Sequence, residues 1–197
     1  MRIIRFDIYS RLMHWSHGLF FIWLMITGIN LFFTKSSLLG DPLIRMVHIY
    51  ASWFFILLPG MLFVIGSQSA RKDVKELTSW NEDDTRWFLH FIKKNKPVIK
   101  GKFNGGQKAN FTATLLLFTG LSFSGIVIWM KSMFSIPFVE LNFLIHDSMA
   151  ILAVLLLTGH LVFAIFYSES LRGIIFGEVD EKWAEVHYPV WKMDKIK

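Results

Sequence analysis

Two histidines, His146 and His160, lie fourteen positions apart in a stretch whose other residues are almost all apolar. Fourteen residues of α-helix rise about 21 Å and end roughly 40° short of four full turns, so both imidazoles face the same side of one helix. An imidazole can bind a metal through a ring nitrogen, or exchange a proton near neutral pH. The spacing therefore predicts two chemically active rings near opposite ends of one long helix.

Two further histidines lie at matching depths, because His14 begins the first apolar stretch and His48 begins the second. If consecutive helices run in opposite directions, His14 is level with His160. His48 is then level with His146. Two imidazoles at one depth on different helices can supply both axial nitrogens of a haem iron, and a porphyrin fits between the helices of a bundle. The depths favour an inner and an outer haem that carry electrons, since both axial positions of each iron are filled and none is left open for a substrate.

Other interpretations of these residues remain. Intramembrane histidines together with Asp147 also suit a haem-free proton relay, and spacing alone leaves that alternative open. His17 lies one helical turn from His14, and could replace it as a ligand, form a local hydrogen bond or contact a haem propionate. Zinc is less favoured, because the pairs lie at opposite membrane faces without carboxylate or thiolate companions. His90 and His187 lie in polar segments, so we assign them no metal.

Four apolar runs must position these histidines, and each has about the 20 residues that a helix needs to cross the hydrocarbon core. They cover residues 12–33, 47–67, 111–130 and 143–167 of a 197-residue chain that is 53% hydrophobic. A lipid-exposed segment must satisfy its backbone hydrogen bonds internally, so each run is expected to be helical. The first run is too long for a signal peptide, and Pro59–Gly60 is expected to kink the second. The sequence predicts an all-α fold, a single-domain integral membrane four-helix transmembrane bundle.

The basic residues set the expected orientation of this bundle. Of 21 Lys and Arg, 18 lie before the first run, in the connection 68–110 or in the extension 168–197, and 3 lie in the other two connections. By the positive-inside rule, both termini and the connection 68–110 should be cytoplasmic. The net charge of +6 then reflects topology and contact with anionic membrane lipid, with no case for nucleic acid. The absence of cysteine excludes iron–sulfur clusters, thiolate zinc sites, c-type haem attachment and disulfides within this chain.

Each of the two polar segments, the connection 68–110 and the extension 168–197, allows two interpretations. The connection 68–110 has an acidic and a basic cluster, and we expect it to lie on the membrane as a short amphipathic helix or to dock a partner. Its apolar side would carry Trp80, Trp87, Phe88 and Phe91. The extension 168–197 is interpreted as an interfacial or partner-binding segment, with a solvated tail as the alternative.

Small residues in the predicted spans also allow two interpretations. They would let a porphyrin approach the helix backbone, or they are ordinary helix-packing positions. These residues are Gly28, Ala51, Gly120 and Gly125.

The stretch GKFNGGQKANF precedes the third run and carries two amide side chains, Asn104 and Gln107. Amide and backbone N–H groups at the membrane surface can bind the carbonyl oxygens of a quinone whose tail lies in lipid. A helix-capping turn flanked by basic residues is the alternative interpretation of the same stretch.

Several of these strings together resemble one family over almost the whole chain, in order. They are RLMHW, TGINLFF, KFNGGQK, SGIVIWM, the pair of histidines fourteen residues apart, and GEVDEKWAEVHYPVW. These strings resemble the gamma subunit of membrane-bound formate dehydrogenases, a di-haem cytochrome b. The KFNGGQK element and the histidine spacing are the most specific parts of the resemblance.

The resemblance implies a ligand set and a quinone site. The family has four spans and cytoplasmic termini in the inner membrane of prokaryotes. The positions that match its inner haem ligands are His14 and His160, and those that match its outer ligands are His48 and His146. The family reduces menaquinone or ubiquinone beside the inner haem, through residues that match Asn104, Gly106, Gln107 and His160. Its electrons come from an iron–sulfur beta subunit, which is fed by a molybdenum or tungsten catalytic alpha subunit on the outer side, and such heterotrimers can form higher oligomers.

The chain departs from the family pattern in two places. IYAS follows His48 where the family often has Pro and Gly, and the C-terminal histidine pair is replaced by His187–Tyr188. Neither change removes a ligand, but both are compatible with another branch of the family. Related cytochromes b serve hydrogenases and sulfur-compound reductases, so those partners are the alternative expectation.

Overall fold

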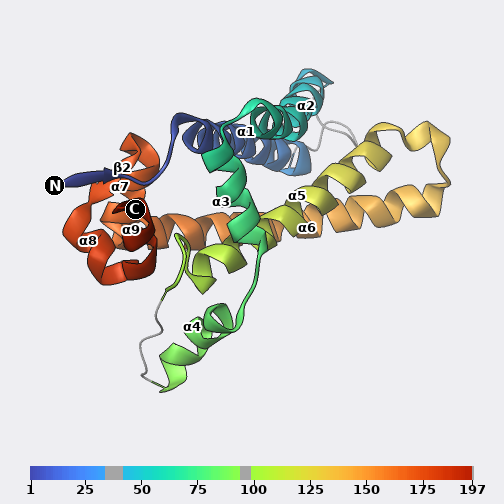
Figure 1. Ribbon diagram of the computed structural model, residues 1–197. Coiled ribbons are helices and arrows are strands. Elements are labelled where there is room, and N and C mark those ends of the chain that lie inside the picture. The colour runs from blue at the N-terminus through green and yellow to red at the C-terminus, as the bar shows by residue number, and fades with distance from the viewer. Residues whose placement is uncertain (34–41, 94–98, 197) are drawn as a thin grey trace. The chain divides into compact units, whose positions relative to one another are not determined.

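The computed structural model describes residues 1–33, 42–93 and 99–196 (Figure 1). The elements, in chain order, are β1 (Arg2–Ile4), α1 (Ile8–Phe33), α2 (Pro42–Ile65), α3 (Gln68–Thr78), α4 (Glu82–Lys93), α5 (Gly105–Trp129), a 3-10 helix η1 (Lys131–Met133), α6 (Ile136–Phe166), α7 (Ser168–Phe176), β2 (Glu178–Asp180), α8 (Glu181–His187) and α9 (Pro189–Ile196).

Four of the helices, α1, α2, α5 and α6, are long and apolar enough to cross a membrane. Only 6–11% of their most apolar windows is buried within the protein, and side chains such as Phe166 are left 79% exposed. In water this would be a large free-energy cost, whereas in lipid it is what a spanning helix requires. The expected all-α, four-helix integral membrane fold is therefore confirmed.

The helices begin before the apolar runs do. α1 begins at Ile8 rather than residue 12, and α5 begins at Gly105 rather than residue 111. Hydropathy identifies only the part of a helix that lies in the hydrocarbon core of the membrane. Backbone hydrogen bonding continues the helix beyond that part, into the membrane–water interface. Pro59 lies inside α2, which continues to Ile65.

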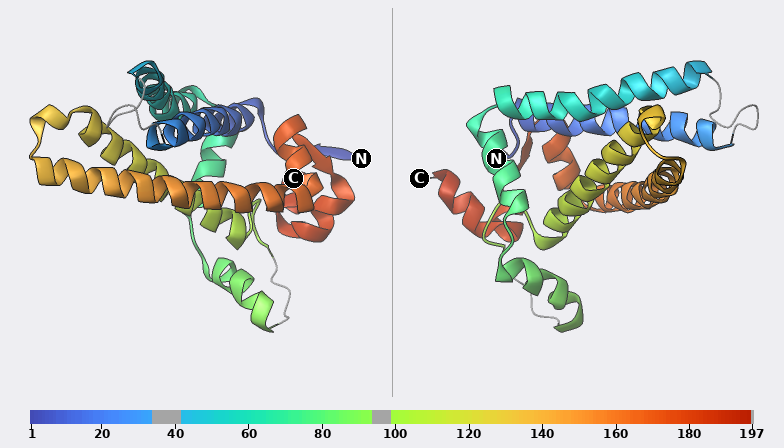
Figure 2. Two further views of the ribbon diagram at one scale, coloured as in Figure 1. Left: turned by 180° about the vertical axis from the view of Figure 1, so that it is seen from behind. Right: turned by 90° about the vertical axis from the view of Figure 1, so that its right-hand side faces the viewer.

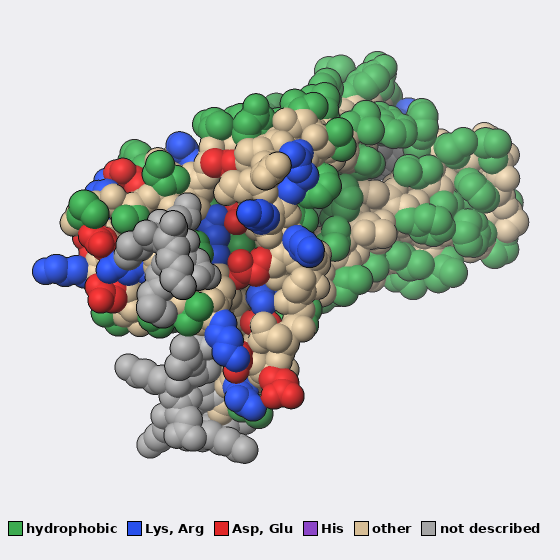
Figure 3. Space-filling view, viewed as in Figure 1, with side chains coloured by type: hydrophobic (Ala, Val, Ile, Leu, Met, Phe, Trp, Pro, Cys, Tyr) green, Lys and Arg blue, Asp and Glu red, His purple; other side chains and the backbone are tan. Residues whose placement is uncertain are grey.

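The chain divides into two compact units. Unit 1 comprises Met1–Arg11, Gly66–Leu115 and Thr158–Lys197, and unit 2 comprises Leu12–Ile65 and Leu116–Leu157. Unit 1 therefore contains the N-terminal segment, the connection 68–110 and the C-terminal extension. Charged side chains gather over these polar segments, whereas hydrophobic side chains cover the long helices (Figure 3).

Unit 2 consists of two antiparallel helix pairs, one from α1 and α2 and one from α5 and α6 (Figure 2). Aromatic stacking joins the first pair, where the rings of Phe20 and Phe54 lie 5.6 Å apart and nearly parallel. Trp53 meets Trp129 edge to face at 5.6 Å, which joins α2 to α5. Aromatic pairs of this kind add to packing beyond the area they cover.

Unit 1 is built around a short antiparallel ribbon in which β1 pairs with β2, and Ile3 is opposite Val179 (Figure 1). Sequence reasoning did not predict these two strands. The buried cluster beside them consists of Val179, Ala184, Tyr188 and Trp191. Arg5 is only 1% exposed, and its guanidinium lies 4.3 Å from the centre of the Tyr188 ring. The extension 168–197 is therefore packed against the N-terminal strand.

Gly177 closes α7 in the left-handed conformation, with φ of 89°. Its carbonyl oxygen accepts hydrogen bonds from the backbone N–H groups of Arg5 and Phe6. A Cβ at this position would lie 2.8 Å from the Phe6 carbonyl oxygen. Glycine is therefore needed here both for the helix end and for the approach of the N-terminal strand.

In the described part of the connection 68–110, the two helices α3 and α4 form where one short helix was expected, and α5 begins at Gly105. Ser67 caps α3 by accepting a hydrogen bond from Ala70 N–H at 3.0 Å. Asn81 and Asp84 form a reciprocal capping box at the start of α4, with each side chain accepting from the other residue's backbone N–H. Two capping signals in one polar segment explain why it forms two helices.

Candidate functional site

The imidazole rings of His48 and His146 face each other within unit 2. His48 lies on α2 and His146 on α6, and their ring centroids are 6.4 Å apart with an interplanar angle of 70°. The structure thus brings together the two histidines that sequence depth had paired on the outer side. Their rings belong to different helix pairs, so the site joins the two halves of unit 2.

A hydroxyl group holds the first of these rings. The Nδ1 of His48 lies 2.8 Å from Thr27 Oγ1 on α1. The same hydroxyl lies 2.9 Å from the Trp23 carbonyl oxygen and 3.1 Å from that of Leu24, one turn earlier on its own helix. Thr27 is only 8% exposed, so water does not compete strongly for these contacts.

The second ring is held in the same way on the other helix pair. The Nδ1 of His146 lies 3.0 Å from Ser124 Oγ on α5, and Ser124 is fully buried. The Ser124 hydroxyl also lies 2.7 Å from the Gly120 carbonyl oxygen. In both cases Nδ1 is engaged, which leaves Nε2 as the ring nitrogen for a metal.

A glycine follows each hydroxyl residue and lies against the same imidazole. A Cβ added at Gly28 would lie 3.5 Å from His48 Cε1, and one added at Gly125 would lie 3.4 Å from His146 Cε1. Sequence reasoning noted both glycines as small residues but missed the hydroxyls beside them. A recognisable sequence signal is a Thr–Gly or Ser–Gly dipeptide on the spanning helix that precedes the helix of each histidine. The strings TGINLFF and SGIVIWM contain these dipeptides.

The inner pair of predicted ligands is divided between the two units. His14 belongs to unit 2 and His160 belongs to unit 1, so their pairing stays a prediction. His17 stacks on Phe55 at 4.4 Å with an interplanar angle of 28°, and also contacts Phe118 at 5.7 Å. An aromatic setting for His17 was not among the roles considered from sequence.

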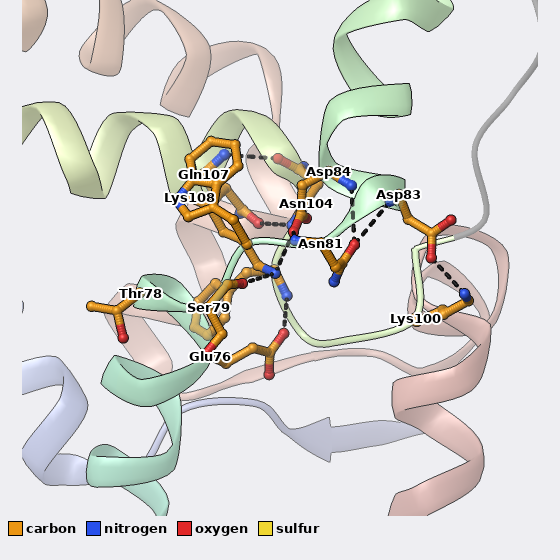
Figure 4. Close-up of polar contacts among 12 residues, drawn as sticks. Glu76, Thr78, Ser79, Asn81, Asp83, Asp84, Lys100, Asn104, Gln107 and Lys108 are labelled. Carbon is orange, nitrogen blue, oxygen red and sulfur yellow. Dashed lines mark hydrogen bonds and ion pairs between the residues drawn. The ribbon is translucent and has the colours of Figure 1, made fainter.

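The two amides of the predicted quinone site cap α5 reciprocally (Figure 4). Asn104 Oδ1 accepts from Gln107 N–H at 2.9 Å, and Gln107 Oε1 accepts from Asn104 N–H at 3.0 Å. Their carbonyl oxygens are thus used locally, whereas their NH₂ groups are not needed for the cap. The Tyr188 hydroxyl lies 3.4 Å from both side chains. A capping turn, the alternative considered from sequence, is therefore present whatever else these amides bind.

The adjacent glycines allow close packing of α4 on the start of α5. A Cβ at Gly105 would lie 2.6 Å from the Asp84 carbonyl oxygen, and one at Gly106 would lie 2.5 Å from the Trp87 ring. Any side chain at Gly106 would therefore displace Trp87. A packing role for Gly106 exists independently of any quinone contact.

Buried charges fix this turn to its surroundings (Figure 4). Lys108 donates to Asp84 Oδ2 at 2.8 Å and to the Ser79 carbonyl oxygen at 2.9 Å. At the surface beside it, Lys100 donates to Asp83 at 2.6 Å, and this hydrogen bond lowers the pKa of Asp83. A surface pocket is lined by residues of this region, including Asp84, Trp87 and Asn104.

Among the described residues, four helices are long and apolar enough to cross a membrane, and two of them carry facing imidazoles; together they define an integral membrane protein with a paired-histidine site. The model of one family, described as prokaryotic cytochrome b561, matches residues 5–177. The chain belongs to this family, and it is a membrane-anchored electron-transfer cytochrome.

The chain is also similar to three relatives over nearly its full length. It is 27% identical to the formate dehydrogenase cytochrome b556 subunit of Haemophilus influenzae, with 99% of this chain and 84% of the relative covered. It is 26% identical to the nitrate-inducible formate dehydrogenase cytochrome b556(Fdn) subunit of Escherichia coli K12, covering 96% and 89% of the two chains. A second protein of that strain, the formate dehydrogenase cytochrome b556(fdo) subunit, is 24% identical, covering 96% and 91%.

The cytochrome family implies haem b, and the facing pair of His48 and His146 fits this group. Two metal–nitrogen bonds of about 2 Å, with roughly 1 Å from each nitrogen to its ring centre, place axial imidazole centroids roughly 6 Å apart. The separation of 6.4 Å between the ring centroids of His48 and His146 agrees with that value. The hydroxyl at each Nδ1 and the glycine at each Cε1 are the surroundings expected for oriented axial ligands.

Proposed function

We propose that the chain is the di-haem cytochrome b subunit of a membrane-bound formate dehydrogenase, and that it passes electrons across the membrane to a quinone. The observation that carries this proposal is the opposition of His48 and His146 in unit 2, together with the names of the three relatives. Formate itself is oxidised in a partner chain.

Four histidines hold the haems in this proposal. His48 and His146 bind the outer haem, and His14 and His160 bind the inner one. Haem iron, when bound, supplies one-electron transfer by changing between its ferric and ferrous states. The residues of the chain fix the positions of the ligands, exclude water and set the polarity around each site.

The quinone acceptor, menaquinone or ubiquinone, binds beside the inner haem in this proposal. Asn104 and Gln107 present amide N–H groups that can donate to a quinone carbonyl oxygen, since their own carbonyl oxygens are used in the helix cap. Gly106 lies in the same turn, packed against the Trp87 ring, and His160 completes the site in this proposal. Protons for quinol then come from the same side of the membrane as this turn.

The partners are an iron–sulfur beta subunit and a molybdenum or tungsten alpha subunit on the outer side, in a complex that can assemble further into oligomers of heterotrimers. The chain lies in the prokaryotic inner membrane with both termini cytoplasmic. This orientation agrees with the charge distribution, because unit 1 contains 18 of the 21 basic residues.

The ligand assignment is tested by His146→Ala in the purified complex. This change should remove the outer haem and halve the haem content per chain. The alpha absorption band of the inner haem should remain in the reduced-minus-oxidised visible spectrum. His187→Ala is the matched control, because that ring is exposed and stacks on Trp183. If His146→Ala retains both haems, the assignment is wrong.

The partner and the reaction class need separate measurements. Formate, and not hydrogen or a reduced sulfur compound, should reduce the cytochrome in the intact complex, and the two partner subunits should copurify. Reduction by hydrogen would instead favour the hydrogenase alternative. A reduced-minus-oxidised spectrum without a sharp alpha band would favour the haem-free proton relay.

A further inference from the structure

Each histidine of the outer site has the same two neighbours on an adjacent helix. Thr27 and Gly28 on α1 lie against His48, and the corresponding dipeptide on α5, Ser124–Gly125, lies against His146. The two arrangements come from different helix pairs of unit 2, yet both place a hydroxyl oxygen within 3.0 Å of Nδ1. The repetition points to a function beyond filling space.

The direction of these hydrogen bonds follows from the other partners of the hydroxyls. A hydroxyl has a single hydrogen, and a backbone carbonyl can only accept. Thr27 Oγ1 lies 2.9 Å from the Trp23 carbonyl oxygen, so its hydrogen is directed there. The contact with His48 is then a hydrogen bond in which Nδ1–H donates. The same reasoning applies to Ser124, whose hydrogen is directed to the Gly120 carbonyl oxygen 2.7 Å away.

We propose that Thr27 and Ser124 are positioning residues that hold His48 and His146 in the Nδ1–H tautomer, so that Nε2 of each ring presents its lone pair to the outer haem iron. This inference rests on the proposed ligand role of the two histidines. The backbone carbonyls thus determine the hydroxyl orientation, and the hydroxyls determine the tautomer and angle of the rings.

The arrangement also affects the redox potential of the outer haem. An imidazole that donates from Nδ1 is a more basic ligand, and a more basic ligand favours the oxidised iron. Removing the acceptor should therefore raise the midpoint potential. The effect should be larger at Thr27, whose hydroxyl oxygen lies 2.8 Å from Nδ1 of His48, than at Ser124, whose hydroxyl oxygen lies 3.0 Å from Nδ1 of His146.

The simpler alternative is that both hydroxyls only bond to their own helices, as serine and threonine commonly do in membrane spans. Ser52 provides a matched control for this alternative. It lies on α2, one turn after His48, and its hydroxyl donates to the Ile49 carbonyl oxygen at 2.7 Å. Ser52→Ala removes a back-bonded hydroxyl from the helix that carries the ligand without altering the contact of His48 with Thr27.

The test is a redox titration of both haems in the purified complex with Thr27→Val, Ser124→Ala, Ser52→Ala and Thr27→Ser. Valine is nearly isosteric with threonine but cannot accept a hydrogen bond. Thr27→Val should raise the outer midpoint potential and leave the inner one unchanged, with haem affinity reduced about 10–100-fold. Ser124→Ala should raise the outer potential less. Ser52→Ala and Thr27→Ser should titrate like the native protein.

The outcomes separate this inference from the ligand assignment. An unchanged outer potential in Thr27→Val, with His48→Ala losing the outer haem, overturns the role of Thr27 and leaves the ligands standing. If Thr27→Val loses the outer haem entirely, retention of the haem in Thr27→Ser supports the role of the hydroxyl, and loss in both variants overturns it. If His48→Ala retains both haems, the ligand assignment and the present inference both fail.

Discussion

Lys108 Nζ in the first turn of α5 lies 2.8 Å from Asp84 Oδ2 in the first turn of α4, and both side chains are almost completely buried. A buried ion pair of this kind is most informative when one partner is removed, because the remaining charge is left without compensation. The pair joins the capping box of α4 to the first turn of α5, so it fixes the turn that carries the two amides.

Lys108→Met should therefore destabilise unit 1 strongly. Leaving Asp84 charged and buried costs about 3–5 kcal/mol, and the midpoint of thermal unfolding in detergent should fall accordingly. Lys100→Gln is the control, because it removes the ion pair between Lys100 and Asp83 at the protein surface, where the Lys100 side chain is 68% exposed. Surface ion pairs contribute about 0–1 kcal/mol to the free energy of unfolding. Equal effects of the two changes would contradict the importance of burial.

Asp7 should make the stability of unit 1 depend on pH. Burial raises its pKa, but hydrogen bonds from Ser67 and Ser10 outweigh burial, so that its pKa lies below the ordinary value of 3.8. A carboxyl with a lowered folded-state pKa stabilises the protein above its unfolded-state pKa, and this contribution is lost as pH falls through the folded-state value.

Asp7→Asn isolates that charge, because asparagine caps a helix about as well as aspartate. The variant should unfold at a lower temperature than the native protein at pH 7. The difference should shrink as pH falls below 3.8, and thermal scans across this range measure it. A difference that stays constant with pH would show that the carboxylate charge is not responsible.

Gly28 should tolerate alanine but not leucine. A Cβ at this position makes an ordinary contact with His48 Cε1 at 3.5 Å, whereas a branched side chain would displace the imidazole. Gly28→Ala should keep the full haem content, and Gly28→Leu should lose the outer haem. Gly18→Leu is the control, since a Cβ there meets nothing within 4 Å. Retention of both haems in Gly28→Leu would contradict the contact.

Asn104→Asp separates the capping role of this residue from quinone binding. Aspartate retains the oxygen that accepts from Gln107 N–H, so the helix cap should survive, but the amide N–H donors are lost. The KM for quinone should rise about tenfold, as expected for the loss of roughly one hydrogen bond, with the thermal midpoint unchanged. Asn104→Ala should lower stability as well. An unchanged KM in Asn104→Asp would leave the amide with a structural role only.

The spanning helices could be predicted from the sequence because lipid imposes a length and a hydrophobicity on each of them. The facing of His48 and His146 followed from the same constraint, since depth in a bilayer is readable from position along a helix. The hydroxyls at Thr27 and Ser124 could not be predicted, because a serine or threonine in a span commonly bonds to its own helix. The contact of Thr27 with His48 and that of Ser124 with His146 depend on how neighbouring helices pack, which the sequence does not reveal.

The polar parts of the chain were harder to predict for a different reason. β1 and β2 have three residues each, too few for an alternation of polar and apolar residues to be recognised, and their pairing joins residues far apart in the sequence. The contacts of the Arg5 guanidinium with the rings of Trp183 and Tyr188 also join residues far apart in the sequence, so they could not be predicted from local patterns. The boundary between α3 and α4, in contrast, is marked locally by Ser79 and Asn81, and attention to capping residues would have located it.

The pairing of Ile3 with Val179 has a consequence for biosynthesis. The first strand leaves the ribosome before any helix, but its partner is translated only after all four spans have been made. A nascent chain that ends before Glu178 therefore contains all of these spans, but β1 still has no strand to pair with. The β1–β2 ribbon therefore forms only after these spans have been translated.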